Sequence, residues 1–422
     1  MNIWVVTIGE PIINNKSSLR LHRSGILSKY ISENSNHNVT WWTSSFNHFL
    51  KEFEFDETTS YFPNKKLNVV AIKGFGYKRN ISISRIIDHY IVSKKFLKIS
   101  KNFEKPDIII CSFPTMGLTK SSIIISKKHG IPLLLDYRDM WPDAFEDILP
   151  ERFKKINKIL VYPLHIYVNK LFNKADGIIG ITEAFLNLGL KKVKRSKNLY
   201  DAHFPLGYKK IGLKKSEVNV ANDFWESKFS RDNKINICFI GTLGHQFDLF
   251  TFIDAFNKFK EKNKFRIILC GSGDNEVKLR ELSKNNENII FPGYINAIQI
   301  KQLLRISHFG LCPYIPKEMF LKAIPGKIIE YFSEGLPIIT TLGDGIVGEI
   351  VNRYKYGINY EAYNTKSILS TFEAILSHKD NFLDKRKLII DYFDKNFNEN
   401  IVFKDYLKHI EAVVDLRIKS ND

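Results

Sequence analysis

One short stretch, over residues 325–337, holds the side chains whose types and spacing are best suited to chemistry. It predicts a helix, because Pro325 can occupy a first turn and Gly335 can follow a last one. Lys327 and Glu330 then share one face, and a lysine so near the helix start opposes the helix dipole at a cost of about 0.3–1 kcal/mol. An anion held there by the ammonium and by free N–H groups would explain this placement. A surface Lys–Glu pair is the structural alternative.

Glycine-containing loops follow three apolar runs in the same part of the chain. Gly241 and Gly244 follow a run that ends at residue 240, and Gly271 and Gly273 follow one that ends at residue 270. Ile295 closes a third such loop. Glycine lets a backbone approach a diphosphate closely, although each loop alone is a common pattern.

Charged residues also end an apolar run in the first half of the chain. Asp136 and Arg138 lie on one side of a predicted strand, because strand side chains alternate with a period of two, and Asp139 begins the next loop. Ligands gather at the carboxyl edge of parallel sheets, so this loop is a candidate binding site. The loop Gly9-Glu10-Pro11 after the first strand, together with Arg20, Arg23 and Ser24 at the next helix start, could contact a phosphate. An internal Asp–Arg pair that holds the loop is the alternative, and the two interpretations are compatible.

The elements that position these residues are short apolar strands alternating with helices, which predicts an α/β fold with parallel sheets. The expected strands cover residues 2–8, 39–43, 67–72, 107–112, 132–136, 177–182, 235–240, 266–270, 289–291, 309–313 and 337–341. The pattern starts afresh near residue 235, after a polar linker over 209–233. We expect two Rossmann-like domains facing across a cleft, over 1–215 and 216–399. We also expect a helix at about 400–422 that packs back on the first domain.

The composition is that of an ordinary globular chain, with 422 residues, 44% hydrophobic and 26% charged. The formal net charge of +18 favours an anionic partner, although general lysine usage would give the same number. Positive charge is concentrated over residues 191–197 and over 81–103, where it predicts a basic amphipathic helix suited to an anionic membrane surface. Nucleic-acid binding needs basic residues interleaved with stacking aromatics, or a recognised module, and neither is apparent in the sequence, so no nucleic acid is expected.

Other features bear on compartment and cofactors. The apolar runs are far shorter than the ~20 residues of a membrane-spanning helix, and the first run lacks the features of a signal peptide. Cysteines are embedded in apolar runs, as expected for reduced core thiols: Cys111, Cys238, Cys270 and Cys312. No Asp-x-Asp motif or cluster with metal-ligand spacing occurs, so no metal is expected. We therefore expect a cytoplasmic protein.

The run Pro325-x-Lys327-x-x-Glu330-Tyr331-x-x-x-Gly335 resembles the donor-binding signature of family 4 glycosyltransferases, which are retaining enzymes of the GT-B fold. The resemblance implies that Glu330 holds the ribose hydroxyls of a UDP- or GDP-linked sugar, with Pro325 and Gly326 beside it. The three glycine loops match, in order and spacing, the family's loops around the diphosphate and the base: Gly241, Gly244, Gly271, Gly273 and Ile295.

The chain departs from the family pattern at two places. Lys322 stands where the family often has a second glutamate, which leaves recognition of the donor sugar open, although Glu318 is near. The Arg and Lys that usually follow the strand ending at residue 240 are also missing. Lys327, Arg138 or His245 could take their place against the leaving diphosphate.

The resemblance implies a metal-independent, hexosyltransferase-like enzyme that transfers a sugar with retention to a lipid-linked saccharide. Its variant of the signature looks like that of the subgroup that builds bacterial surface polysaccharides, such as capsule, O-antigen of lipopolysaccharide, or exopolysaccharide. Such an enzyme would lie peripherally on the inner face of the plasma membrane. Lys327, Arg138 and Asp139 would be its catalytic residues, with Lys327 at the leaving diphosphate and the other two by the reacting sugar.

Three other functions remain open. A nucleotide-sugar epimerase of the same fold would need an acidic and histidine catalytic set, which we do not find in the sequence. A dinucleotide oxidoreductase would need Gly-x-Gly-x-x-Gly after the first strand, where the chain has Gly9-Glu10-Pro11. A non-catalytic membrane-associated adaptor would keep the positive charge without needing a nucleotide site.

Overall fold

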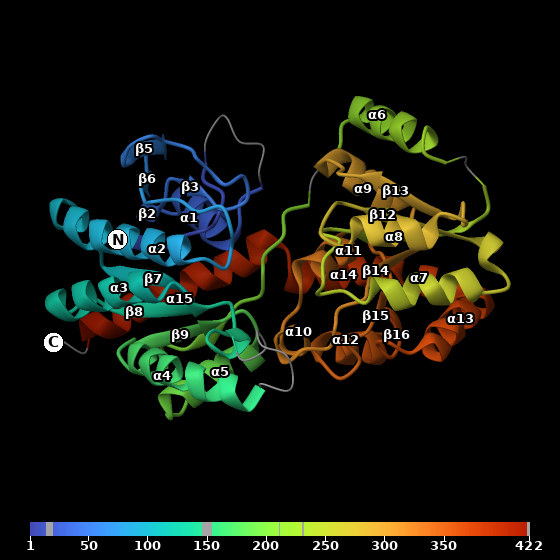
Figure 1. The fold of residues 1–422 in the computed structure, drawn as a ribbon. Coiled ribbons are helices and arrows are strands. Elements are labelled where there is room, and N and C mark those ends of the chain that lie inside the picture. Colours follow the sequence, from blue (N-terminus) through green and yellow to red (C-terminus); the bar gives the residue numbers. More distant parts are fainter. Residues whose placement is uncertain (14–19, 146–153, 211, 230–231, 420–422) are drawn as a thin grey trace. The chain divides into compact units, whose positions relative to one another are not determined.

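The computed structural model describes residues 1–13, 20–145, 154–210, 212–229 and 232–419. The chain forms two compact units, the first from Met1–Pro205 with Val402–Asp422 and the second from Leu206–Ile401 (Figure 1). The chain therefore passes from the first unit to the second between Pro205 and Leu206 and returns to the first between Ile401 and Val402. Each unit has its own sheet and core.

The described part of the first unit is built on an eight-stranded sheet with the order β10-β9-β8-β7-β1-β2-β6-β5. Its neighbouring strands are parallel except for β5, which runs antiparallel to β6. The strands are β1 Asn2–Val6, β2 Asn38–Ser44, β5 Thr59–Asn64, β6 Leu67–Ile72, β7 Ile108–Phe113, β8 Leu133–Tyr137, β9 Gly177–Gly180 and β10 Ala202–His203. A small antiparallel pair, β3 Phe46–Asn47 and β4 Glu52–Phe53, follows β2. The central strands are apolar runs buried on both faces, as predicted.

Helices cover both faces of this sheet (Figure 1). On one face, α1 (Arg23–Asn34) and α15 (Glu399–Lys419) share a core with alternate residues of the strands; Phe403, Ile410 and Val413 of α15 are fully buried there. On the other face lie α2 (Ile83–Ile99), α3 (Met116–His129), α4 (Lys154–Phe172) and α5 (Glu183–Val193). Short 3-10 turns cover Ser100–Asn102 and Asp143–Phe145.

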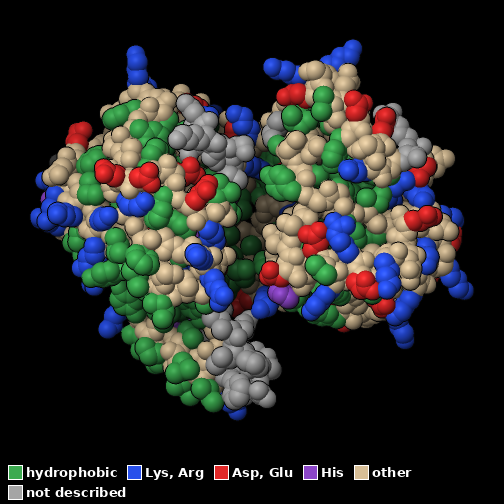
Figure 2. All heavy atoms as spheres, turned by 45° about the horizontal axis from the view of Figure 1, so that its top comes forward, with side chains coloured by type: hydrophobic (Ala, Val, Ile, Leu, Met, Phe, Trp, Pro, Cys, Tyr) green, Lys and Arg blue, Asp and Glu red, His purple; other side chains and the backbone are tan. Residues whose placement is uncertain are grey.

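The helix α2 packs differently from an ordinary amphipathic helix. Its inward residues include Val92 and Phe96, while Ile83, Ile86 and Tyr90 are 75%, 70% and 61% exposed. The apolar face expected over 81–103 therefore lies largely on the surface. Figure 2 shows hydrophobic side chains interleaved with Lys and Arg on the visible surface of the first unit.

The second unit is a Rossmann-like layer structure with the strand order β13-β12-β11-β14-β15-β16, all parallel. The strands are β11 Ile235–Ile240, β12 Phe265–Cys270, β13 Ile289–Gly293, β14 Phe309–Cys312, β15 Ile338–Thr340 and β16 Gly357–Asn359. The helices are α6 Lys215–Glu226, α7 Leu249–Lys258, α8 Glu276–Ser283, α9 Ala297–Ile306, α10 Glu318–Lys322, α11 Gly326–Ser333, α12 Ile346–Tyr354, α13 Thr365–Leu383 and α14 Arg386–Asn396, with a 3-10 turn at Lys262–Lys264.

The polar stretch expected to be a linker contains the helix α6. The buried Trp225 ties α6 to the second unit, because its indole N–H donates to the Gln299 carbonyl of α9 at 3.0 Å. The four cysteines are free and buried, as predicted. Among the described residues, no helix is long and apolar enough to cross a membrane.

Candidate functional site

Two glycine loops of the second unit run backbone against backbone at the carboxyl ends of β11 and β12. The Gly241 N–H donates to the Cys270 carbonyl at 3.0 Å. A Cβ at Gly271 would lie 2.0 Å from the Gly241 carbonyl oxygen, and one at Gly273 would lie 2.6 Å from that of Leu243. Glycine is therefore required here for close packing of the loops, and the packing holds their amide groups at the ligand-binding edge of the sheet.

A third loop joins these two at the same edge. The Gly271 N–H donates to the Gly293 carbonyl at 2.8 Å, and Gly293 has a φ of +80°. Ile295 follows with its side chain buried, so that only its backbone could face a ligand. On the other side, the Gly244 N–H donates to the Thr242 carbonyl at 2.9 Å in a tight turn. The structure thus brings the predicted loop residues to one edge.

The helix α11 is fastened to the end of β11 by Tyr331. The Tyr331 hydroxyl is buried and accepts the Ile240 N–H at 3.1 Å. Its ring lies against Gly310, where a Cβ would come within 2.2 Å. Pro325 is the N-cap rather than a first-turn residue, so Gly326 begins the helix, and Gly335, with a φ of +71°, follows its end. These contacts fix where the helix start points.

Lys327 does not lie on the helix surface. Its Nζ is buried, without a hydrogen-bond partner among the residues described, 3.4 Å from the Phe239 ring centroid and 4.1 Å from that of Phe247. A Cβ at Gly241 would contact its Cε and Nζ at 3.4 Å, so the ammonium lies directly beside the first glycine loop. Burial lowers the Lys327 pKa to about 7, although nearby Glu330 acts in the opposite direction. The alternative of a plain surface Lys–Glu pair is therefore wrong.

Glu330 is held by a residue that the motif does not contain. The Tyr208 hydroxyl donates to Glu330 Oε1 at 2.8 Å, and Tyr208 is itself fixed by backbone hydrogen bonds to Phe397 and Glu399. Tyr208 comes from the segment just after the first crossing between units, and no spacing in the sequence links it to Glu330. Nearby on α10, Lys322, at the position of the family's second glutamate, forms an ion pair with Glu318.

In the first unit, Arg138 is the centre of a buried ion-pair network. Its guanidinium donates to Asp136 and to Glu10, and to Ser24 Oγ at 2.8 Å. Asp136, which is fully buried, also accepts from Arg23 Nε at 3.0 Å. Glu10 in turn accepts the Ser24 N–H at 2.9 Å. The network joins the loop after β1, the start of α1 and the end of β8.

This network is the internal Asp–Arg pair that the sequence allowed as an alternative. Burial opposes ionisation of Asp136, but Arg138 and Arg23 outweigh it and lower the Asp136 pKa. The Arg138 pKa is raised by Asp136 and Glu10, despite burial. Two arginines therefore balance two carboxylates, and the Arg138 charge is already paired before any ligand binds.

Asp139 lies in the loop after β8, where it is half-buried. Burial raises its pKa, against hydrogen bonds from the Met140 backbone and the Trp141 side chain. Arg138 and Asp139 are adjacent in sequence but differ in environment, because Arg138 points into the ion-pair network and Asp139 does not take part in it.

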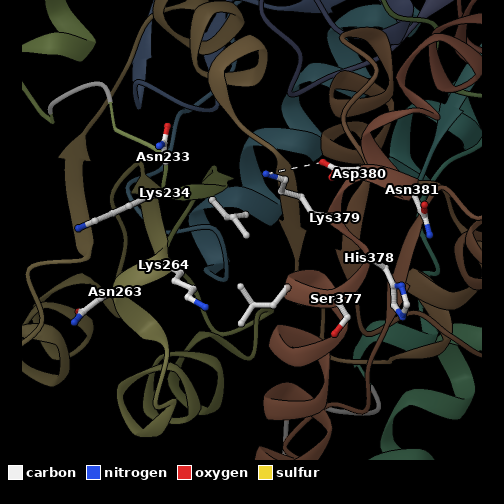
Figure 3. A pocket seen from close by; sticks show the side chains of 11 residues that line it. Asn233, Lys234, Asn263, Lys264, Ser377, His378, Lys379, Asp380 and Asn381 are labelled. Carbon is white, nitrogen blue, oxygen red and sulfur yellow. Dashed lines mark ion pairs between the residues drawn. The ribbon is translucent and has the colours of Figure 1, made fainter.

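Figure 3 shows a hollow of about 550 Å³ in the second unit, whose lining includes none of the predicted donor residues. It is lined by Lys234 and Lys264, which lie at or near the amino ends of β11 and β12, and by the 377–381 part of α13. Ligands of parallel α/β sheets bind at the carboxyl ends, where the glycine loops are. This hollow is therefore not our candidate donor site. Among the described residues, no group of three or more His, Cys, Asp and Glu side chains is arranged to hold a metal ion.

Residues 221–394 match the family model described as glycosyl transferases group 1. Two uncharacterised glycosyltransferases of Methanocaldococcus jannaschii are similar in sequence. One is 22% identical over 251 residues, covering 58% of this chain and 60% of the relative; the other is 24% identical over 163 residues, covering 36% and 40%. The matched parts thus span less than two thirds of either relative's length.

Solved structures of other proteins resemble the whole chain in fold. Sucrose-phosphate synthase from Thermosynechococcus elongatus has a TM-score of 0.73 at 11% identity, covering 98% of this chain and 99% of that one. Anabaena HepE in complex with UDP-glucose has 0.63 at 14%, covering 98% and 100%. WaaG, a glycosyltransferase involved in lipopolysaccharide biosynthesis, has 0.62 at 12%, covering 99% of both. The chain therefore has the GT-B fold, as predicted, and its second unit carries the match to group 1 glycosyl transferases.

Proposed function

We propose that the protein is a retaining glycosyltransferase resembling family 4, which transfers a sugar from a UDP- or GDP-linked donor bound to the second unit. The observation that carries the proposal is the buried ammonium of Lys327, which has no hydrogen-bond partner among the described residues; it lies beside the Gly241 loop, three residues before Glu330. A buried cation without a counter-ion is costly, and a diphosphate would supply the missing charge. The match over residues 221–394 covers these residues, and the neighbour HepE was solved with UDP-glucose.

In this proposal each part of the site has one task. Glu330, oriented by Tyr208, accepts hydrogen bonds from the ribose hydroxyls. Lys327, the amides of the Gly241 loop and the start of α11 neutralise the diphosphate as it leaves, which is where electrostatic stabilisation contributes most. With that charge met by the protein, we propose that transfer does not depend on a divalent metal. Activity that persists in the presence of EDTA is the expected result.

Retention follows from attack on the face that the diphosphate leaves. The bond from the anomeric carbon to the phosphate oxygen breaks, the acceptor oxygen forms its bond on the same face, and its proton passes to the departing phosphate. We propose that Asp139 and Arg138 of the first unit lie beside the reacting sugar. Arg138 then acts by positioning the loop of Glu10 and Ser24, because its guanidinium is already paired.

The surface of the first unit supports a lipid-linked saccharide acceptor and attachment to the inner face of the plasma membrane. Besides α2, the helix α4 exposes Ile159, Leu160 and Tyr162, at 73%, 67% and 63%. Isolated apolar side chains are normal on a surface, but two such faces on helices that both pack against α3 mark an interaction surface. Lysines on the same helices suit anionic lipid. The role we propose is assembly of a bacterial surface polysaccharide.

The second basic stretch contributes less than its sequence indicates. Within residues 191–197, Lys192 pairs with Asp143 at 2.9 Å and Arg195 pairs with Asp201. The remaining lysines of the stretch are exposed: Lys191, Lys194 and Lys197. We therefore assign the membrane contact mainly to α2 and α4.

Calorimetry with UDP, GDP and their sugars tests the donor site. Glu330→Ala should weaken binding of the cognate nucleotide, whereas Glu334→Ala, which removes a like charge at the end of the same helix, should not. Equal affinities of wild type and Glu330→Ala would overturn the site. Product analysis separates the alternatives, because an epimerase converts the sugar without releasing the nucleotide and an adaptor does neither.

Sedimentation with phosphatidylglycerol vesicles tests the membrane contact. Ile86→Ser combined with Tyr90→Ser should reduce the bound fraction. Val220→Ser, which removes an exposed hydrophobic side chain from α6 of the second unit, is the matched control. Unchanged sedimentation of the double variant would reject the α2 surface.

A further inference from the structure

A cationic and aromatic cluster in the first unit is not used by the mechanism above. We call it the Lys51–Arg85 cluster; its members are His48, Lys51, Tyr77, Arg85, His89 and Trp141. They come from the segments that follow the carboxyl ends of β2, β6 and β8. This is the edge of a parallel sheet at which ligands bind.

The rings of Tyr77 and Trp141 hold the two cations in place. The Arg85 guanidinium lies 5.7 Å from the Tyr77 ring centroid and 5.8 Å from that of Trp141, and Lys51 Nζ lies 4.9 Å from the Tyr77 ring. Asn80 accepts from both cations, through its side-chain oxygen from Lys51 and through its carbonyl from Arg85 at 2.8 Å. Two positive charges are thus kept near one ring.

The described residues offer these two cations no ion pair. Arg85 Nε is buried and has no hydrogen-bond partner among them. Burial raises the pKa values of Asp88 and Asp139 and the charge of Arg85 opposes this rise, although neither carboxylate forms an ion pair with Arg85 among the described residues. Asp88 Oδ1 instead accepts the backbone N–H groups of Phe75 and Gly76, at 2.8 Å each. Burial is the larger cause of the lowered Lys51 pKa, and the like charge of Arg85 lowers it further. A bound anion would relieve this repulsion.

Two histidines extend the cluster as neutral hydrogen-bonding groups. His48 Nδ1 lies 2.6 Å from the Tyr77 hydroxyl. Burial, with Lys51 and Arg85, lowers the His48 pKa to about 4, and burial with Arg85 and His48 does the same for His89. At neutral pH both imidazoles are therefore uncharged, and each carries one N–H that can donate to an anion.

The same segments carry exposed apolar side chains, which we call the apolar rim. Leu50, Phe75, Ile81 and Ile86 are 52%, 59%, 77% and 70% exposed. A free phosphate needs only the cations, whereas an anion attached to a long apolar chain would also cover this rim. Cations without an ion pair among the described residues, next to exposed apolar side chains, therefore favour an anion attached to an apolar chain.

We propose that the Lys51–Arg85 cluster binds the diphosphate of a prenyl-type lipid that carries the acceptor saccharide, with the lipid chain over the apolar rim. The inference rests on the proposed function, since it names the acceptor class of the same reaction. A ring contact connects the cluster to the other loops of this edge: Phe49 lies 5.3 Å from the ring of His22, next to Arg23 of the Arg138 network.

Binding of farnesyl diphosphate to the full chain, in saturating cognate nucleotide to occupy the donor site, tests the proposal. Lys51→Gln combined with Arg85→Gln should weaken binding by roughly tenfold or more, since charge-assisted hydrogen bonds are lost. Lys98→Gln combined with Lys101→Gln removes two charges from the far end of α2 and its following turn, and should leave the affinity unchanged. Arg85→Lys, in the wild-type background, should retain part of the affinity.

Two further probes separate the possible sources of the phosphate. Inorganic diphosphate should bind more weakly than farnesyl diphosphate, and Ile86→Ser should reduce only the binding of the latter. Phosphatidylglycerol vesicles should still bind the double glutamine variant through α4. Equal binding of both diphosphates, or unchanged farnesyl diphosphate binding in a folded double variant, would overturn the proposal. A protein that binds nucleotide but not farnesyl diphosphate would refute this inference alone, whereas absence of nucleotide binding would refute the donor site.

Discussion

Replacing Lys327 by Met should make the ligand-free protein more stable. The Lys327 pKa falls from 10.5 to about 7, mainly through burial. At 1.36 kcal/mol per pKa unit, the buried charge costs on the order of 4–5 kcal/mol at low pH. This cost already includes the attraction of the ammonium to the rings of Phe239 and Phe247, because that attraction acts on the charged form. We therefore expect Lys327→Met to stabilise the second unit by about 4 kcal/mol near pH 7, or about 8–16 °C in Tm.

The pH dependence of this difference has a definite sign. Between pH of about 7 and 10.5 the unfolded chain keeps the Lys327 proton and the folded chain has lost it. Stability therefore rises with pH across this interval in the wild type, because the unfolded state binds more protons. Lys327→Met lacks this contribution, so its advantage should be largest below pH 7 and should shrink towards pH 10.5.

Binding of the nucleotide should show the opposite side of the same linkage. A diphosphate beside Lys327 favours the charged ammonium, so binding above pH 7 should take up a proton, and affinity should fall as pH rises. Thermal unfolding over a pH series, with Lys278→Met as an exposed-lysine control, measures the stability effect. Calorimetry in buffers of different ionisation enthalpy measures the proton. A Lys327→Met variant that is less stable at every pH, with the wild-type pH slope, would refute the reasoning.

Arg138→Met should lower the free energy of unfolding by about 3 kcal/mol, because the buried Asp136 keeps only one of its two arginine partners. Thermal unfolding measures this loss, and an unchanged Tm would contradict the ion-pair network. Tyr331→Phe should cost about 1–2 kcal/mol by leaving the buried Ile240 N–H unpaired, measurable by denaturant unfolding, and a neutral result would argue against the α11–β11 link. Gly271→Ala should lower the free energy of unfolding by about 2 kcal/mol or more, because its Cβ would collide with the Gly241 carbonyl oxygen. If the variant had the stability and the nucleotide affinity of the wild type, the two loops would not need this close contact.

Strands buried on both faces were the easiest elements to predict. The apolar runs at 67–72 and 235–240 are strands with the predicted bounds, because continuous burial in a parallel sheet requires continuous apolar sequence. The sheet-edge strands β5, β10 and β16 were missed. The strand β5 has the sequence TSYFPN and is largely exposed, so it shows neither an apolar run nor a regular alternation. The helix α6 in the predicted linker was missed because its buried face is small.

The donor loops could be located from the sequence, but the state of Lys327 could not. Helical spacing places Lys327 on a polar face, whereas its burial depends on Phe239 and Phe247, which come from β11 and the loop after it. Tyr208, which holds Glu330, lies even earlier in the sequence than Phe239 and Phe247. In the same way, the period-two pattern placed Asp136 and Arg138 on one side, but partners such as Glu10 are brought to them only by the tertiary fold.

The return of α15 to the first unit also has a consequence for the order in which the chain folds during synthesis. Residues 206–401 form one uninterrupted segment, whereas the first unit needs Val402–Asp422 to complete it. The ribosome releases the whole second unit before the helix residues Phe403, Ile410 and Val413, which fill the core of the first. Since domains generally fold as units, the second unit can reach its final structure while the first, although made earlier, still lacks one side of its core.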